Sequence, residues 1–247
     1  MTRRPMVFVH GLIGSLQAPT LHSPFAPTPT LAPDLLGYGV ERGADPATIT
    51  LTAQADHVHQ AARVAFGDQP VTVIGHSVGG AIGALLAHRH PEQVAALVSV
   101  EGNFTLGDAF WSASVARMLE EEAESLMAGF RADPAGWLAR SGVPPTPEHL
   151  EAAADLLSRQ PGSTVRAMGR AVVDATGHPS YLNAVEAVFN AIPVHLVAGE
   201  RSIIGWNLPD WAKDKAASLT VIPNTGHMMM VENPTAFTDV LARCLTD

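Results

Sequence analysis

Ser77 occupies the centre of a G-x-S-x-G motif that begins at Gly75 and ends at Gly79. Residues 71–74 before the motif form a short apolar run typical of a buried strand, and residues 79–88 form an apolar helical segment. On so sharp a strand-to-helix turn, the serine is held out at the strand end, in front of free helix N–H groups. Because such N–H groups stabilise developing negative charge, the motif predicts that Ser77 is a nucleophile.

A nucleophilic serine needs a general base, and histidine serves in this role most often. Of the eleven histidines, His227 alone follows the last predicted strand of the core, in a glycine-containing loop. His57 and His59, and likewise His88 and His90, are two residues apart on predicted helices and so point to different sides. This spacing disfavours a shared metal ion, and we expect no metal and no organic cofactor.

A scaffold must position these residues, and strand-like and helix-like segments alternate along the chain, which is typical of a parallel sheet covered by helices. Apolar and β-branched runs predict strands at residues 6–9, 30–32, 71–74, 94–100, 194–198 and 219–222. Helical patterns occur at residues 50–66, 79–88, 148–160, 163–173 and 234–245. The expected fold class is therefore α/β, with a mostly parallel sheet and helices on both faces.

The pattern changes between residues 103 and 192, where no β-branched run occurs and helical periodicity takes over. One apolar stripe runs through Trp111, Val115, Met118, Leu119, Leu126, Met127 and Phe130. We therefore expect an α/β core of residues 1–102 and 193–247, interrupted by a helical insertion of residues 103–192. The length of 247 residues fits this arrangement better than two equal domains.

Composition excludes several kinds of partner and site. Fifteen lysines and arginines against 24 aspartates and glutamates give a net charge of -9, without any basic run. We therefore expect no nucleic acid and no membrane surface as partner. The single cysteine, Cys244, cannot form a disulfide within the chain. No secretory signal and no apolar stretch of about 18 residues is visible, which predicts a soluble, cytoplasmic protein.

Five motifs, in the expected order, resemble those of the α/β-hydrolase family, and the resemblance covers nearly the whole chain. They are His10-Gly11, Pro33-Asp34-Leu-Leu-Gly37-Tyr-Gly39, the G-x-S-x-G motif, His90-Pro91-Glu92-Gln-Val94, and Asn224-Thr-Gly226-His227 followed by Glu232-Asn-Pro234. By this resemblance Ser77 is the nucleophile and His227 its general base. The resemblance also assigns the oxyanion hole to the backbone N–H groups of Leu12 and Val78.

The acid that orients His227 departs from the usual pattern of that family. The family commonly places an aspartate three residues after the glycine that ends the penultimate strand, where this chain has Ser202. Some members carry the acid at the end of the strand after the nucleophile helix, and Glu101 stands there. We expect Glu101 to be the acid, because sites in parallel sheets gather at the carboxyl edge, with Glu200 and Asp210 as lesser candidates.

The resemblance makes the insertion a helical cap over the active site, with Trp111, Met118 and Met228 expected in the substrate pocket. A serine nucleophile favours acyl transfer to water through an acyl-enzyme. Since the motifs around Ser77 and His227 hold no arginine or lysine, the expected substrate is a small or medium, fairly apolar carboxylic ester or lactone. Two alternatives remain: a C–C bond hydrolase or perhydrolase with the same triad, and a non-catalytic ligand receptor on the hydrolase fold.

Overall fold

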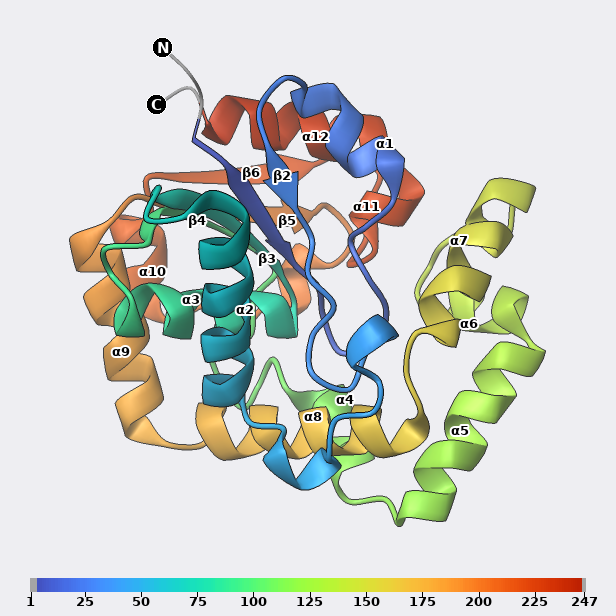
Figure 1. Cartoon of the computed structure of the whole chain (residues 1–247). Helices are drawn as coiled ribbons and strands as arrows, with labels where there is room; N and C mark the ends of the chain where they lie inside the picture. Colours follow the sequence, from blue (N-terminus) through green and yellow to red (C-terminus); the bar gives the residue numbers. More distant parts are fainter. Residues whose placement is uncertain (1–3, 246–247) are drawn as a thin grey trace.

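The computed structural model describes residues 4–245, so residues 1–3 and 246–247 of the expected core lie outside the described part. Its centre is a six-stranded sheet with the order β2-β1-β3-β4-β5-β6, in which every neighbouring pair is parallel (Figure 1). The strands are β1 (Met6–Val9), β2 (Thr30–Leu31), β3 (Val71–His76), β4 (Val94–Val100), β5 (Val194–Gly199) and β6 (Ser218–Ile222). The expected α/β class with a parallel sheet is confirmed.

Helices surround this sheet, and several begin at recognisable sequence signals. Thr50 caps α2 by accepting a hydrogen bond from the N–H of Ala53 at 3.0 Å, and prolines occupy the first turns of α6, α7, α9 and α12. The helices are α1 (Pro19–His22), α2 (Leu51–Phe66), α3 (Val78–Arg89), α4 (Phe110–Ala116), α5 (Glu120–Ala132), α6 (Pro134–Arg140), α7 (Pro147–Ser158), α8 (Gly162–Thr176), α9 (Pro179–Ala191), α10 (Asp210–Lys215), α11 (Met229–Glu232) and α12 (Pro234–Cys244).

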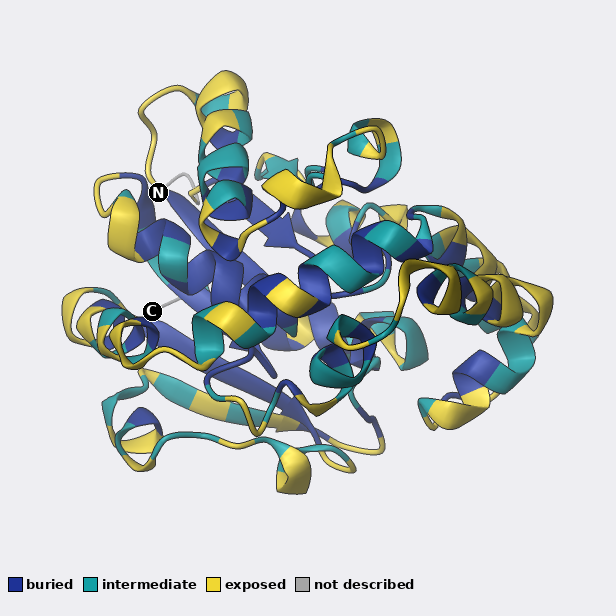
Figure 2. Cartoon of the chain, turned by 90° about the horizontal axis from the view of Figure 1, so that it is seen from below, coloured by how far each residue is buried: buried dark blue, intermediate teal, exposed yellow. Residues whose placement is uncertain are grey.

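Strands β1, β3 and β5 are buried on both faces, as their continuous apolar runs predict, whereas the edge strand β6 exposes Leu219 and Val221 (Figure 2). Along β1, Val7 and Val9 belong to the larger hydrophobic core, to which α2, α3 and α9 contribute. Met6 and Phe8 point to the opposite face and pack in a second core with α1 and α12. The sheet therefore lies between two helical layers, and all its strands end at one common edge.

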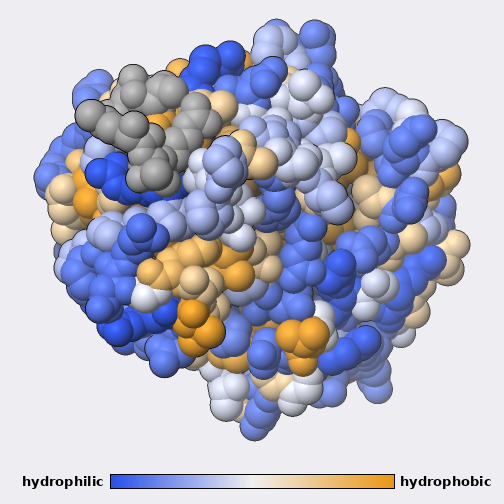
Figure 3. All heavy atoms as spheres, turned by 45° about the horizontal axis from the view of Figure 1, so that its top comes forward, coloured by the Kyte–Doolittle hydropathy of each residue, from blue (hydrophilic) through white to orange (hydrophobic). Residues whose placement is uncertain are grey.

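The outer surface is mixed, and its exposed apolar side chains include Val40, Val64, Phe110 and Ile204. Apolar patches are interspersed among hydrophilic residues on the face brought forward in Figure 3. Within residues 4–245, no helix combines the length and the apolar character that crossing a membrane requires.

Six helices, α4 to α9, occupy the chain between β4 and β5. Helices α5, α6 and α7 project to one side of the sheet, whereas α8 runs in contact with α2 and α4 (Figure 1). Helix α9 packs against α3 and so covers the sheet. The apolar stripe expected over residues 111–130 is divided between α4 and α5, because the chain turns at residues 117–119 and leaves Leu119 57% exposed.

The turn from β3 into α3 requires two glycines, because the backbones approach closely there. A Cβ atom at Gly75 would lie 2.3 Å from the carbonyl oxygen of Gly79, and one at Gly79 would lie 2.0 Å from the carbonyl oxygen of Val9. A side chain at either position would push α3 away from the sheet. The glycines of the G-x-S-x-G motif thus allow the first turn of α3 to pack on the strands.

The substitution Gly79→Ala should lower the free energy of unfolding by at least about 2 kcal/mol, since the new methyl group meets backbone atoms that cannot move aside. Gly129→Ala is the matched control, because a Cβ at this exposed position in α5 meets nothing within 4 Å. It should raise stability by about 0.5–1 kcal/mol through helix propensity. Urea unfolding measures both changes, and equal effects would contradict this packing account.

Candidate active site

Ser77 stands between the last residue of β3 and the first residue of α3, at the carboxyl edge of the sheet. Its φ of 55° is a conformation that residues other than glycine seldom adopt. The surrounding backbone holds it there: the N–H of Ser77 donates to the carbonyl of Val100 at 2.9 Å, and its carbonyl accepts from Gly80 and Asn103. The Ser77 side chain makes no capping bond to α3, and the residue lines a cavity.

Glu101 and His227 meet at the same edge of the sheet. Nδ1 of His227 donates a hydrogen bond to Oε2 of Glu101 at 2.5 Å. The carboxylate side chain is 5% exposed, whereas the imidazole is 43% exposed. Since the Nδ1 hydrogen points toward Glu101, Nε2 is the nitrogen left to exchange a proton with a hydroxyl group.

Glu101 is held as a carboxylate by donors on its other oxygen. Oε1 accepts from the N–H of Gly199 at 2.9 Å and from the hydroxyl of Ser202 at 2.5 Å. Burial by itself raises the pKa of Glu101, but the bond and charge of His227 together with these two donors outweigh it and lower the pKa below its ordinary value. Ser202, at the position where the resemblance expects an aspartate, therefore donates to the acid.

The loop that carries His227 is fixed by polar contacts from several elements. Oε1 of Glu232 accepts from the N–H of Gly226 at 2.9 Å, and its other oxygen accepts from Arg201 at 2.5 Å. Nε2 of His76 donates to the carbonyl of His227 at 2.9 Å. These contacts hold the imidazole where it meets Glu101, which reduces the entropy lost when the site acts.

Two buried donors fix the segment that follows β1. Nδ1 of His10 donates to the carbonyl of Gly11 at 2.9 Å, and the hydroxyl of Tyr38 donates to the carbonyl of Leu12 at 2.8 Å. The first bond orients the peptide that carries the N–H of Leu12, and the second orients the next peptide. Neither His10 nor Tyr38 was expected to position this N–H from the sequence, although His10 opens the motif.

His10 and His76 are both buried and neutral at pH 7. Burial lowers the pKa of His10 to about 4. Burial also holds the pKa of His76 well below its ordinary value, and the nearby His227 adds to this effect. The position of His76 directly before Ser77, as the last residue of β3, is the sequence signal for this role, because the end of the strand lies at the same edge as the nucleophile.

The other residues predicted for the site separate into two groups. Trp111 and Met228 line the cavity beside the nucleophile. Met118 does not line it and is partly buried against the hydrophobic core. Of the lesser candidates for the acid, Glu200 accepts from a backbone N–H of the loop after β6, and Asp210 is exposed at the start of α10.

The cavity has a volume of about 630 Å³ and joins the sheet edge to helices α4, α5 and α6. Gly11, Leu12, Ser77, Glu101 and His227 line its sheet side. Aromatic side chains make up much of the opposite wall, and they are Phe110, Trp111, Phe130 and Trp137. Trp206, which follows β5 and donates to the carbonyl of Gly102, lines the cavity from the sheet side. This lining suits an apolar ligand whose reacting group lies at the sheet edge.

Two guanidinium groups reach the cavity, although the motifs around Ser77 and His227 contain none. Arg201 is neutralised by its ion pair with Glu232. Arg140 lies over the ring of Phe130, with its guanidinium carbon 5.0 Å from the ring centroid. The cavity wall is therefore apolar with a small number of polar groups.

Histidines from two different helices also meet away from this cavity. The ring of His59 in α2 stacks on that of His90 at the end of α3, with centroids 3.7 Å apart, and Glu92 lies close by. Parallel stacked rings direct their nitrogen lone pairs in separate planes, so one metal ion could bind both only after a ring rotates. The H-x-H spacing describes histidines within one helix, so it could not predict a contact between His59 and His90, which come from different helices.

The buried histidines should make stability depend on pH. Between pH 6.5 and about 4 the unfolded His10 takes up a proton and the folded one does not, so stability falls as pH falls. For His10 this amounts to about 2 kcal/mol between pH 7.5 and 5. His10→Asn keeps a donor near the Nδ1 position and removes the titration, so urea unfolding should show a smaller loss over this range.

The control for this substitution is His88→Asn, at an exposed position on α3. It should keep the pH dependence of the wild-type protein. If His10→Asn and His88→Asn lose the same free energy of unfolding between pH 7.5 and 5, the assignment of a neutral buried His10 is wrong.

Comparison with known proteins places this site in a family and a fold. Lipase LipV of Mycobacterium tuberculosis is 47% identical over 78 residues, which are 30% of this chain and 27% of that protein. The chain thus matches only about a quarter of the length of that relative. The solved structure of MenH from S. aureus superposes with a TM-score of 0.74 and 20% identity, covering 100% of this chain and 94% of the other.

A second solved structure, Est816, is described as an N-acyl homoserine lactone degrading enzyme. It is 25% identical, with a TM-score of 0.65, and the match covers 97% of this chain and 92% of the other. The sequence model of the alpha/beta hydrolase fold family matches residues 4–234. With that match over nearly its whole length, the chain belongs to the alpha/beta hydrolase fold family.

Proposed function

We propose that this protein is a serine hydrolase that cleaves a small or medium, fairly apolar carboxylic ester or lactone. The observation that carries the proposal is the hydrogen bond between His227 and Glu101 beside a cavity that Ser77 lines. In the proposed reaction, Nε2 of His227 takes the hydroxyl proton of Ser77 while the serine oxygen attacks the substrate carbonyl carbon. The N–H groups of Leu12 and Val78 stabilise the resulting oxyanion.

The second half of the reaction uses the same groups in reverse. The protonated imidazole of His227 gives its proton to the leaving alkoxide, and an acyl group remains on Ser77. Water then gives a proton to His227 and attacks the acyl carbon. When this second intermediate collapses, its bond to the serine oxygen breaks, His227 returns the proton to that oxygen, and the carboxylic acid leaves. Glu101 stabilises the imidazolium in both halves through its buried, ionised carboxylate.

Two relatives support the choice of bond. LipV is named a lipase, and Est816 is described as an N-acyl homoserine lactone degrading enzyme, which supports an ester or lactone as the substrate. The apolar lining of the cavity supports a substrate with an apolar acyl group. A receptor without catalysis would not require a buried carboxylate paired with a half-exposed imidazole next to a serine in a strained turn.

We also propose that residues 103–192 form the cap expected from the sequence. Trp111, Phe130 and Trp137 come from α4, α5 and α6 and line the cavity opposite the sheet edge. Their position supports a role in selecting the acyl group. The last helix of this segment, α9, packs on α3. We therefore propose that α9 belongs to the inserted segment and also covers the α/β core.

Glu101→Gln should lower kcat for a p-nitrophenyl ester by about 10³–10⁴, because an amide cannot stabilise the imidazolium and can hold His227 in the wrong tautomer. Ser202→Ala should cost less than about tenfold, since it removes one of several donors to the carboxylate. Glu200→Gln is the control and should leave kcat within about twofold. A larger loss for Ser202→Ala than for Glu101→Gln would contradict the assignment.

A substrate panel separates this function from its alternatives. The wild-type protein should hydrolyse p-nitrophenyl esters of two to eight acyl carbons and simple lactones, and Ser77→Ala should abolish both activities. A C–C bond hydrolase would instead turn over dicarbonyl compounds faster than esters, and a perhydrolase would consume peroxide. Steady-state kinetics on the panel measures this, and tight ligand binding without turnover of any compound would favour the receptor.

A further inference from the structure

A second cavity lies beside the first and reaches His76 and Met228, the neighbours of Ser77 and His227 in the chain. Its volume is about 290 Å³, and its walls come from the segment after β1, from α7 and from α11. Gly11, Ile13, His76 and Met228 line both cavities, so the two spaces adjoin at these four residues. No role has been assigned to this space above.

We propose that the second cavity binds the alcohol half of the ester and that this alcohol carries a further hydroxyl group. This inference rests on the ester hydrolysis proposed above and adds the class of alcohol. The first cavity, with its aromatic lining, then receives the acyl half.

The position of the general acid supports this division. When the tetrahedral intermediate collapses, the bond from the acyl carbon to the alcohol oxygen breaks, and that oxygen takes the proton held on Nε2 of His227. The leaving alcohol must therefore lie next to His227. The following residue, Met228, lines both cavities, and Met230 and Val231 continue along the second cavity. An alcohol that departs past Met228 enters this space.

The chemistry of the walls points to a hydroxylated ligand without negative charge. Ser15, Thr20 and His149 offer hydroxyl or imidazole groups, whereas Glu148 disfavours an anion and Asp155 is neutralised by its ion pair with Arg159. The walls include neither lysine nor arginine among the described residues. Most of the remaining lining is aliphatic and, among the described residues, includes no Phe, Tyr or Trp, so these polar side chains are the groups available to a ligand hydroxyl.

His10 supplies an independent observation at the inner end of this cavity. Its Nδ1 hydrogen is used by the carbonyl of Gly11, so Nε2 is a hydrogen-bond acceptor. Nε2 is buried without a hydrogen-bond partner, although buried polar atoms are normally paired. A ligand hydroxyl group would supply the missing donor, which an alkyl group of the same size could not do.

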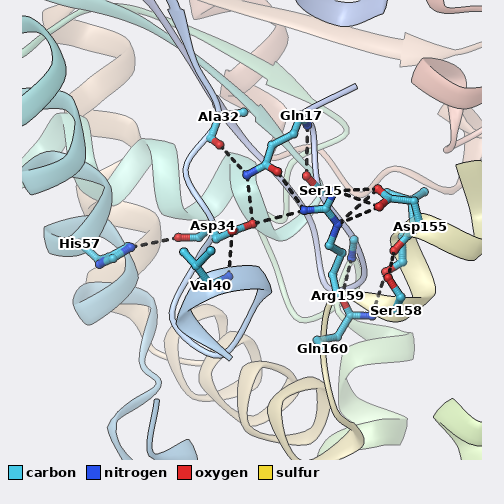
Figure 4. Close-up of polar contacts among 12 residues, drawn as sticks. Ser15, Gln17, Ala32, Asp34, Val40, His57, Asp155, Ser158, Arg159 and Gln160 are labelled. Atoms are coloured by element: carbon cyan, nitrogen blue, oxygen red, sulfur yellow. Dashed lines mark hydrogen bonds and ion pairs between the residues drawn. The ribbon is translucent and has the colours of Figure 1, made fainter. Parts of the chain in front are cut away.

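A network of hydrogen bonds holds the outer wall of the second cavity together (Figure 4). Arg159 donates to Asp155 in α7 at 2.9 Å and to Oε1 of Gln17 at 2.9 Å. Nε2 of Gln17 donates in turn to Asp34 and to the carbonyl of Ala32, at 3.1 Å each. These bonds tie α7 to the segment after β1, so the space between them has a defined shape.

The hydroxyl requirement is tested with two esters of the same shape. Glyceryl 1-butyrate and 2-methylbutyl butyrate share the acyl group, and each hydroxyl of the first is a methyl group in the second. The wild-type kcat/KM should be at least tenfold higher for the glyceryl ester. Equal or reversed values would overturn the hydroxyl requirement.

The location is tested by filling the cavity. Ala152→Trp on α7 places an indole in the second cavity, and Ala154→Trp on the same helix is exposed and serves as the control. Ala152→Trp should lower kcat/KM at least tenfold for glyceryl butyrate relative to methyl butyrate. It should leave the ratio of methyl octanoate to methyl butyrate unchanged, and Ala154→Trp should change neither ratio.

If Ala152→Trp instead lowers the ratio of kcat/KM for methyl octanoate to that for methyl butyrate, the acyl half lies in this cavity. If it lowers kcat/KM equally for all esters, this cavity is not a subsite. Either result overturns the proposal. If Ala152→Trp does not fold, Leu156→Ala enlarges the same cavity and should raise kcat/KM for butyrates of larger polyols by at least threefold. No change would then count against the proposal. If the wild-type protein cleaves methyl butyrate but the results above are not obtained, only the proposed subsite is wrong. If the wild-type protein cleaves no ester, the proposed function itself is wrong.

Discussion

The hydrogen bond between Nδ1 of His227 and Glu101 depends on three strand ends meeting at one edge of the sheet. Glu101 follows β4, its two other donors come from the end of β5 and the loop after it, and His227 lies in the loop after β6. A parallel sheet brings these ends together regardless of the distances along the chain. A shift in the register of β5 would remove the donors to Glu101 and the carboxylate would lose its compensation for burial.

Two buried histidines, His10 and His76, fix the backbone segments around the nucleophile in the same way. His76 ties the His227 loop to the end of β3, and His10 orients the peptide that precedes Leu12. Both bonds use a neutral ring, because an imidazolium would be too costly to bury. The same neutrality leaves Nε2 of His10, a residue that lines the second cavity, as an acceptor.

Local patterns predicted most of the scaffold and the central site residues. The runs at 6–9 and 94–100 match β1 and β4 residue for residue, because strands buried on both faces are continuously apolar. Ser77 was identifiable since its turn needs glycines at fixed spacing. Glu101 was identifiable because it directly follows a predicted strand, which places its carboxylate at the carboxyl edge of the sheet. The contact between Glu101 and His227 agrees with that reasoning.

What the sequence did not predict depends on contacts between distant segments. The donation from Ser202 to Glu101, the stacking of His59 on His90, and the placement of Met118 in the core rather than the cavity all depend on how separate elements pack. The break between α4 and α5 was missed because the apolar period continues across it. Short helices such as α6 and α10 lack enough turns to show a period.

The central claim is that Ser77 is a nucleophile activated by His227 and Glu101. Intact-protein mass spectrometry after reaction with a fluorophosphonate tests this claim most directly. The account predicts one phosphonyl adduct per chain, mapped by proteolysis to Ser77, and its absence in a variant that lacks the imidazole of His227. An unmodified wild-type protein, or an adduct on any other residue, would contradict the account.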